Sequence, residues 1–179
     1  FDIEELRIYD VSRAALERFR EDMQSAIPGR IILCDDPKDA AQGDAVICVT
    51  QSKDGFLKEE WLSPETIVSP MGSYQECEDD VLLHADKIVV DHVEQTLHRG
   101  ALSKLAAEGK ITRESITCTI GELVAGRAEL HREPGQRIVC LPIGTGAMDI
   151  GCASVVYQRA LEQKRGQFFD FGVSSATEW

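Results

Sequence analysis

The chain has 179 residues, long enough for one domain with a sizeable core, and is 43% hydrophobic and 28% charged, an ordinary globular composition. Its formal net charge of -12 argues against nucleic acid and anionic membranes as partners, because both select basic surfaces. No apolar run approaches the length of a membrane span, and the first residues form no basic-then-apolar leader. We therefore expect a cytoplasmic protein that binds neither nucleic acid nor a membrane.

The cysteines and histidines do not have the spacing of a metal site. None of the six cysteines belongs to a C-x-x-C pair, and Cys34, Cys48 and Cys140 lie in apolar runs typical of strands. The four histidines are scattered along the chain. We expect reduced thiols in the core of a cytosolic protein, with no metal and no disulfide.

The first part of the chain alternates short apolar strands with helices. Expected strands cover residues 6–10, 30–34, 44–49 and 66–69. A helix is expected over 12–26, a short helix or turn over 37–42, and a helical turn over 58–62. Ser12 suits the N-cap of the first helix, because its hydroxyl can accept a backbone N–H of the first turn. The strand over 44–49 is almost continuously apolar, as expected for a buried parallel strand.

The second part repeats this alternation. Expected strands cover 87–91 and 137–143, and expected helices cover 76–84, 93–108, 119–126 and 147–165. Gly100 is expected to break the helix over 93–108, and the tail from Gln167 is expected to leave the domain. The alternation predicts an α/β fold, a Rossmann-type doubly wound and mostly parallel sheet with helices on both faces.

Ligands of such sheets bind at the carboxyl ends of the strands, so the residues that follow each strand form the candidate site. They are Asp10, Thr50, Gln51, Ser52, Met71, Gly72, Ser73, Asp91 and the turn Gly144-Thr145-Gly146. Thr50 and Ser52 place hydroxyls where a nucleotide would cross the sheet edge, and Gly72 allows a close backbone approach. An ordinary turn and an ordinary loop glycine are the alternatives.

Asp10 is the most informative of these residues. In dinucleotide-binding folds, an acid at the end of the second strand accepts hydrogen bonds from the adenosine ribose hydroxyls. Its carboxylate would repel a 2′-phosphate, which favours NAD, although Arg13 nearby could pair with that phosphate and leaves NADP open. Alternatively, Asp10 caps the helix that follows it.

Two other motifs are interpreted as structural. Gly144-Thr145-Gly146 begins like the dinucleotide fingerprint G-x-G-x-x-G, but Asp149 stands at the third glycine position. We therefore interpret the turn as part of a late strand–turn–helix unit. Asp149 lies in the first turn of its helix, where a carboxylate is favoured, and a direct role of Asp149 in the active site is an equal alternative. The acidic run over 76–80 is expected to be a solvated helix face rather than a metal site.

The chain begins at Phe1, without an initiator methionine, and enters a strand almost at once. If residues 6–10 are the second Rossmann strand, as Asp10 indicates, then the first strand, its glycine loop and the first helix lie upstream of Phe1. We expect the chain to be a processed or truncated portion of a longer protein.

Several segments, in their order along the chain, carry a resemblance to a known family. They are IYDVSRAALERF, GDAVICVTQS, EEWLSPETIVSPMGS, ADKIVVDHVEQ followed by GAL, IGELVAG and IGTGAMDIGCASVVYQRALEQKRGQ. They resemble the ornithine cyclodeaminase / mu-crystallin family and cover almost the whole chain. The resemblance implies a homodimer with an NAD(P)-binding Rossmann domain, incomplete here over 1–146. It also implies a separate substrate and dimerisation domain, toward which 147–179 would return.

The resemblance further implies redox chemistry at a carbon–nitrogen bond, with hydride passing between an amino-acid or cyclic imine substrate and the nicotinamide. It matches Asp10 to the ribose-binding acid, 50–52 to the strand end that contacts the cofactor, and 71–73 to the loop beside the nicotinamide. The cofactor-binding residues expected on these grounds are Asp10, Ser12, Arg13, Thr50, Gln51, Ser52, Met71, Gly72 and Ser73.

The loop after Gly72 departs from the family pattern. Cyclodeaminase-type members carry a catalytic aspartate two residues after this glycine, where this chain has Tyr74, and the loop is shortened if Glu76 aligns with the family's helix start. Ornithine cyclodeamination itself is therefore not expected, and Tyr74, with an unperturbed pKa near ~10, is the candidate for the catalytic position.

Three hypotheses follow from these residues. The leading one is the cofactor portion of an NAD(P)-dependent amino-acid or imine oxidoreductase, inactive by itself. The second is a non-catalytic ligand-binding protein of the mu-crystallin type. The third is a methyltransferase-like domain in which Asp10 holds a ribose, ranked lower because the chain does not end in a predicted hairpin.

Overall fold

The structure, a computed structural model, describes residues 2–169. The chain divides between Ile143 and Gly144 into two units, each of which is described by itself. In the described part of the first unit, residues 2–143, seven strands form two separate sheets. The tail predicted from Gln167 onward lies mostly outside the described residues.

The smaller sheet has two parallel strands, β1 (Glu5–Ile8) and β2 (Arg30–Leu33), paired from Glu5↔Arg30 to Ile8↔Leu33. Helix α1 (Arg13–Met23) connects them and buries Leu16. The predicted N-cap is confirmed, because the Ser12 side chain accepts a hydrogen bond from the backbone N–H of Ala15 at 3.3 Å. The predicted strand–helix–strand order of this region is therefore correct.

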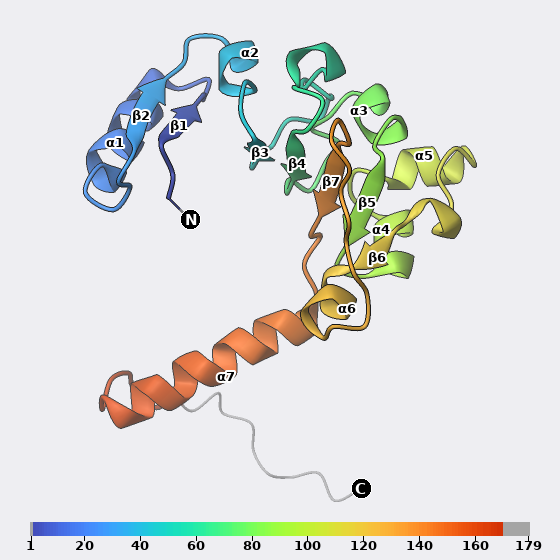
Figure 1. The fold of residues 1–179 in the computed structure, drawn as a ribbon. Helices are drawn as coiled ribbons and strands as arrows, with labels where there is room; N and C mark the ends of the chain where they lie inside the picture. The colour runs from blue at the N-terminus through green and yellow to red at the C-terminus, as the bar shows by residue number, and fades with distance from the viewer. Residues whose placement is uncertain (1, 170–179) are drawn as a thin grey trace, which may run out of the picture. The chain divides into compact units, whose positions relative to one another are not determined.

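The larger sheet has five strands in the order β3-β4-β7-β5-β6, and every neighbouring pair is parallel (Figure 1). Its strands are β3 (Ala45–Cys48), β4 (Ile67–Pro70), β5 (Lys87–Val90), β6 (Cys118–Thr119) and β7 (Ile138–Leu141). The last strand in sequence lies at the centre of the sheet, so β3 and β4 are joined to β5 and β6 only through β7. The predicted α/β class with a parallel sheet is confirmed.

Short helices connect these strands. They are α2 (Pro37–Ala40), the 3-10 turn η1 (Glu59–Trp61), α3 (Asp79–Leu83), α4 (Val93–His98), α5 (Ser103–Ala107), η2 (Arg113–Ser115) and α6 (Ile120–Val124). The predicted helix over 93–108 is split into α4 and α5, as expected at Gly100, whose φ of +76° suits glycine. None of the described helices is long and apolar enough to cross a membrane.

Apolar side chains cover both faces of the larger sheet. Successive residues of a strand point to opposite faces, and on β5 Ile88 and Val90 belong to the main core cluster whereas Val89 belongs to a second one. The main cluster includes Leu82 of α3 and Leu105 of α5, and the second cluster packs against α6. The sheet is thus doubly covered, as predicted. The six cysteines are free thiols; four are buried, as expected for core residues, whereas Cys140 is half-buried and Cys152 is exposed.

Some elements differ from the sequence-based expectation, among them α3 and β6. Helix α3 begins at Asp79 rather than at residue 76, because the segment before it pairs with an earlier loop. The amides of Phe56 and Leu57 both donate to the carbonyl of Glu76, at 2.9 and 3.0 Å. Strand β6 was not expected, since two residues are too few for a periodic pattern.

The second unit contains α7 (Gly146–Glu162), with Asp149 in its first turn as expected. Apolar side chains of α7 are exposed, among them Ile150, Val156 and Tyr157. The turn before it has Gly144 at φ +80°, a conformation that favours glycine. Gly144 therefore serves the turn into α7, in line with its interpretation as part of a late strand–turn–helix unit.

Candidate functional site

The parallel register of β3 and β4 brings two predicted site residues together. Cys48 lies opposite Pro70, and the amide of Met71 continues the ladder by donating to the carbonyl of Cys48 at 2.8 Å. Thr50 and Gly72 each follow their strand by two residues, so they lie at the same carboxyl edge of the sheet.

Glu76 joins these two strand ends. Its Oε1 accepts hydrogen bonds from the backbone N–H of Thr50 at 2.5 Å and from the Thr50 hydroxyl at 2.6 Å. Its Oε2 accepts one from the backbone N–H of Gly72 at 2.7 Å. The side chain is 0% exposed, so the expectation that the acidic run forms a solvated face is wrong for this residue. Buried polar groups are stable only when hydrogen-bonded, and these donors meet that requirement.

Gly72 is required by this arrangement. A Cβ at Gly72 would lie 2.6 Å from Cδ of Glu76 and 2.8 Å from the carbonyl oxygen of Thr50. Real Cβ atoms do not approach heavy atoms so closely. The close approach predicted for Gly72 therefore exists, and its partners are groups of the protein itself.

A cavity of about 210 Å³ opens at the carboxyl ends of β4 and β7. Its lining residues are Pro70, Met71, Gly72, Ser73, Arg99, Gly100, Ala101, Leu141, Pro142 and Ile143. The predicted loop residues Met71, Gly72 and Ser73 thus line a cavity. The lining contains no carboxylate, and its charged side chain is that of Arg99.

Arg99 was not predicted from the sequence. Its Nη2 donates to the carbonyl of Ile143 at 3.1 Å, which fastens the end of α4 to the end of β7. The helix break at Gly100 was the available sequence signal, because a chain that leaves a helix beside a strand end places its flanking residues at the ligand-binding edge.

The other predicted residues of this edge lie outside the cavity lining. Tyr74 is 49% exposed and is not among the lining residues. Ser52 supports its own loop, since its hydroxyl donates to the carbonyl of Asp54 at 2.8 Å and its amide donates to the hydroxyl of Thr50 at 3.2 Å. Gln51 is exposed beside them. Their assignment to the cofactor stays a prediction.

Asp10, Ser12 and Arg13 lie together after β1. Oδ1 of Asp10 accepts a hydrogen bond from the amide of Ser12 at 2.7 Å, so Asp10 orders the loop and Ser12 is the N-cap. Arg13 pairs with Glu17 at 3.2 Å and with Asp35, which follows β2, at 2.9 Å. The carboxyl end of this sheet is therefore acidic, and the guanidinium of Arg13 is paired with two carboxylates.

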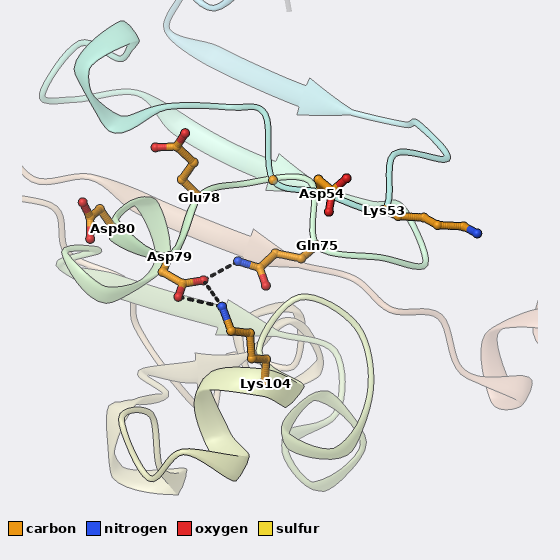
Figure 2. A pocket seen from close by; sticks show the side chains of 8 residues that line it. Lys53, Asp54, Gln75, Glu78, Asp79, Asp80 and Lys104 are labelled. Atoms are coloured by element: carbon orange, nitrogen blue, oxygen red, sulfur yellow. Dashed lines mark hydrogen bonds and ion pairs between the residues drawn. The ribbon is translucent and has the colours of Figure 1, made fainter.

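A second, more polar hollow of about 530 Å³ lies between the loop after β3, the start of α3 and α5 (Figure 2). Within it, Asp79 accepts hydrogen bonds from Gln75 and from Lys104, whose Nζ lies 2.9 Å from Oδ2. The Lys104 ammonium lowers the pKa of Asp79. These contacts hold α3 to α5, and none of the predicted cofactor residues lines this hollow.

The amino edge of the larger sheet carries a different polar group. Arg137, which precedes β7 and is 8% exposed, donates from Nη1 to Oε1 of Glu59 at 2.8 Å. Oε2 of Glu59 lies 2.8 Å from Nδ1 of His84. The Arg137 hydrogen bond lowers the pKa of Glu59, and the Glu59 carboxylate raises the pKa of His84. We refer to these three residues as the amino-edge ion pairs.

The comparisons with known proteins are consistent with this geometry. The profile of the Ornithine cyclodeaminase/mu-crystallin family matches residues 1–164. The chain is 29% identical over 175 residues to the alanine dehydrogenase of Archaeoglobus fulgidus, a match to 96% of this chain and 53% of that protein. It is 29% identical over 167 residues to the N-((2S)-2-amino-2-carboxyethyl)-L-glutamate dehydrogenase of Staphylococcus aureus, a match to 92% and 49% of the two chains.

A solved structure agrees as well. The fold matches that of an archaeal alanine dehydrogenase dimer with bound NAD at a TM-score of 0.84 and 30% identity, over 96% of this chain and 54% of that one. The chain therefore spans about half the length of these relatives.

Proposed function

This chain belongs to the ornithine cyclodeaminase/mu-crystallin family, and we propose that it forms the NAD-binding portion of an oxidoreductase. The enzyme would act on a carbon–nitrogen bond of an amino acid or a cyclic imine. The observation that carries the proposal is the carboxyl edge of the parallel sheet, where Thr50 and Gly72 are fastened side by side and the loop 71–73 lines a cavity.

The residues after β1 and β2 fit NAD better than NADP. Asp10 offers a carboxylate to ribose hydroxyls, and its one described side-chain hydrogen bond engages Oδ1 only. Asp35 and Asp36 follow β2, and the Arg13 guanidinium is held by Glu17 and Asp35. A 2′-phosphate would meet several carboxylates there, which supports a preference for NAD.

The chain's own residues would bind and orient the cofactor. When bound, the nicotinamide accepts or supplies the hydride. Asp10 would hold the adenosine ribose, residues 50–52 would border the path across the sheet edge, and the loop 71–73 would lie beside the nicotinamide. These are roles of binding and orientation, which lower the barrier by placing the reacting carbon near the ring.

The cavity beside the loop 71–73 favours dehydrogenase or imine reductase chemistry over cyclodeamination. Its lining has no carboxylate, and Tyr74 stands where cyclodeaminase-type relatives would place an acid. Two relatives are dehydrogenases of amino acids or their derivatives. We propose that most substrate contacts and the homodimer interface belong to a separate domain of the full-length protein, toward which 147–179 returns from the cofactor domain, 1–146.

The open strand edges support a longer cofactor domain. Within the described residues β1 pairs only with β2, and β3 pairs only with β4. A further parallel strand would satisfy such edges, and in the full-length protein we propose that it carries the glycine loop. The encoded residues upstream of Phe1 test this, since the proposal requires a G-x-G-x-x-G-like turn within ~30 residues, after an apolar strand.

Cofactor titration of the full-length protein tests the function directly. We expect NADH to bind more tightly than NADPH, followed by turnover with an amino acid or cyclic imine. Asp10→Asn keeps the oxygen that accepts the Ser12 amide but removes the charge, and should weaken NADH roughly tenfold and narrow the preference over NADPH. The control Asp22→Asn, on the exposed end of α1, removes the same charge and should leave both affinities unchanged. Equal effects of the two variants would refute the ribose role.

A non-catalytic ligand-binding protein is the second candidate. The composition of the cavity lining favours a binding protein, because the lining contains no acidic residue and does not include Tyr74. Tight NADH binding with no turnover across amino acids and cyclic imines would select this alternative over the enzyme.

A further inference from the structure

We propose that Glu76 is a positioning residue of the cofactor site. It fastens the ends of β3 and β4 together and so holds the loop 71–73 in the shape that receives the nicotinamide. This inference rests on the proposed function, because NAD binding is what the loop shape would serve.

The two carboxylate oxygens of Glu76 bind to the ends of two different strands. Oε1 serves β3 alone, through the amide and the hydroxyl of Thr50, and Oε2 serves β4 alone, through the amide of Gly72. One carboxylate therefore fixes the distance between two loops that are 22 residues apart in sequence, from Thr50 to Gly72. Neither oxygen can be lost without releasing one of the loops.

Glu76 is itself held from three sides. Its carbonyl accepts the amides of Phe56 and Leu57, its side chain is 0% exposed, and the bare Cα of Gly72 lies against its carboxyl group. The segment after β3 and the segment after β4 also form a parallel bridge at Leu57↔Cys77. The Glu76 carboxylate is thus held in place, and its hydrogen bond to the amide of Gly72 holds the loop 71–73 in turn.

The donors to Glu76 are neutral. In the part of the chain that the structure describes, its partners are two backbone amides and one hydroxyl, and it forms no ion pair. Backbone amides are the groups whose orientation sets a loop's conformation, so this carboxylate acts on loop geometry rather than on a charged side chain. The amides of Thr50 and Gly72 are thus held by Glu76, and the loop 71–73 that contains Gly72 lines the cavity.

A released loop would weaken cofactor binding by a predictable amount. If the binding-competent loop conformation falls to a tenth of the population, the apparent Kd rises about tenfold. Glu76→Gln keeps the volume and the acceptor for Thr50, but turns an N–H toward the N–H of Gly72. It therefore releases the β4 side and leaves the packing in place.

Thr66→Val provides a matched control. Thr66 is 0% exposed, precedes β4 at the opposite edge of the sheet, and donates one buried hydrogen bond to the carbonyl of Gly43 at 2.9 Å. The substitution removes that bond with little change of shape. It should lower thermal stability without changing the loop 71–73.

The experiment uses the full-length protein and two readouts. Without cofactor, hydrogen–deuterium exchange of the peptide over 70–74 should be at least about tenfold faster in Glu76→Gln than in wild type, and unchanged in Thr66→Val. With NADH, the Kd should rise roughly tenfold in Glu76→Gln and less than about twofold in Thr66→Val. If Glu76→Gln does not fold, Thr50→Val removes one of the three bonds, and exchange of the peptide over 70–74 is then the deciding readout, because Thr50 is itself a predicted cofactor residue. Exchange should be faster than in wild type, and unchanged exchange would overturn the positioning role.

The outcomes separate the inference from its premise. Lower stability in Glu76→Gln with unchanged exchange and unchanged Kd would overturn the positioning role and leave Glu76 a purely structural residue. Faster exchange with unchanged Kd would overturn it too, because the loop would be released without consequence for the cofactor. A wild-type protein that does not bind NADH would refute the proposed function, and with it the role of Glu76 toward NAD.

Discussion

The two edges of the five-stranded sheet each contain a carboxylate that bridges segments distant in sequence, and they satisfy it differently. At the amino edge, Glu59 is bound by the cationic Arg137 and by His84. At the carboxyl edge, Glu76 is bound by neutral donors of Thr50 and Gly72. The first arrangement joins side chains, and the second fixes the backbone of two loops.

This difference separates stability from ligand binding. An ion pair between side chains holds elements together, and its contribution to stability depends on pH. It does not set the backbone conformation of nearby loops. A carboxylate bound to backbone amides instead sets the geometry of the loops that carry those amides. We therefore expect damage at the amino edge to change stability alone, and damage at the carboxyl edge to change stability and cofactor binding together.

The largest effect on stability is expected from Arg137→Met at the amino edge. The substitution leaves Glu59 without its main partner. Because Arg137 is buried and Glu59 is about a third exposed, the free energy of unfolding should fall by about 2 to 3 kcal/mol, the upper part of the range for a hydrogen bond between charged groups. Chemical denaturation measures it, and NADH affinity of the full-length protein should be unchanged. Arg132→Met is the matched control, because Arg132 is exposed and, among the residues that the structure describes, donates to a backbone carbonyl, that of Glu65. Equal losses in the two variants would contradict the account.

Gly72→Ala is the corresponding change at the carboxyl edge. The added methyl group would lie 2.6 Å from Cδ of Glu76, and overpacking of this kind lowers the free energy of unfolding by about 2 kcal/mol. The loop must shift, so NADH affinity should fall as well. In Gly121→Ala the new Cβ would lie 4.0 Å from Oγ1 of Thr119, an ordinary contact, and this helical position should gain a few tenths to ~1 kcal/mol of stability. A destabilised Gly72→Ala protein with wild-type NADH affinity would show that the two edges do not differ.

A smaller, pH-dependent effect is expected from His84→Gln. Because Glu59 raises the pKa of His84 above its unfolded value of about 6.5, the pair stabilises the fold fully below pH 6.5 and loses this contribution as pH rises through the raised pKa. The lowered pKa of Glu59 works in the other direction, so its contribution is present above about pH 4.5 and lost as pH falls through that lowered value.

The difference in Tm between wild type and His84→Gln should therefore be largest near pH 5.5 and should shrink by pH 8.5. The change is small because His84 is exposed and solvent screens the pair. Thermal unfolding at both pH values measures it. A difference that is the same at both would mean that the charge on His84 plays no part.

Much of the fold was predictable because many of its features depend on residues that are close together in the sequence. The apolar runs of β3, β5 and β7, the Ser12 cap and the break at Gly100 are each set by residues within a few positions of one another. Their alternation with helices was enough to predict a parallel sheet and its carboxyl edge.

The residues that organise that edge were not predictable in the same way. Glu76 stands in a run of acids that resembles an exposed helix start, and its burial depends on Thr50, 26 residues earlier. Arg99 contacts Ile143, 44 residues later. Such partners are defined by the register of β3, β4 and β7, which sequence periodicity does not specify.

A crystal structure of the full-length protein with NADH would show which edge of the sheet receives the nucleotide. We expect the adenosine ribose at Asp10, and the nicotinamide beside the loop 71–73, with the three hydrogen bonds of Glu76 intact. A nucleotide bound instead at the amino-edge ion pairs, or in the polar hollow beside Asp79 and Lys104, would contradict this expectation.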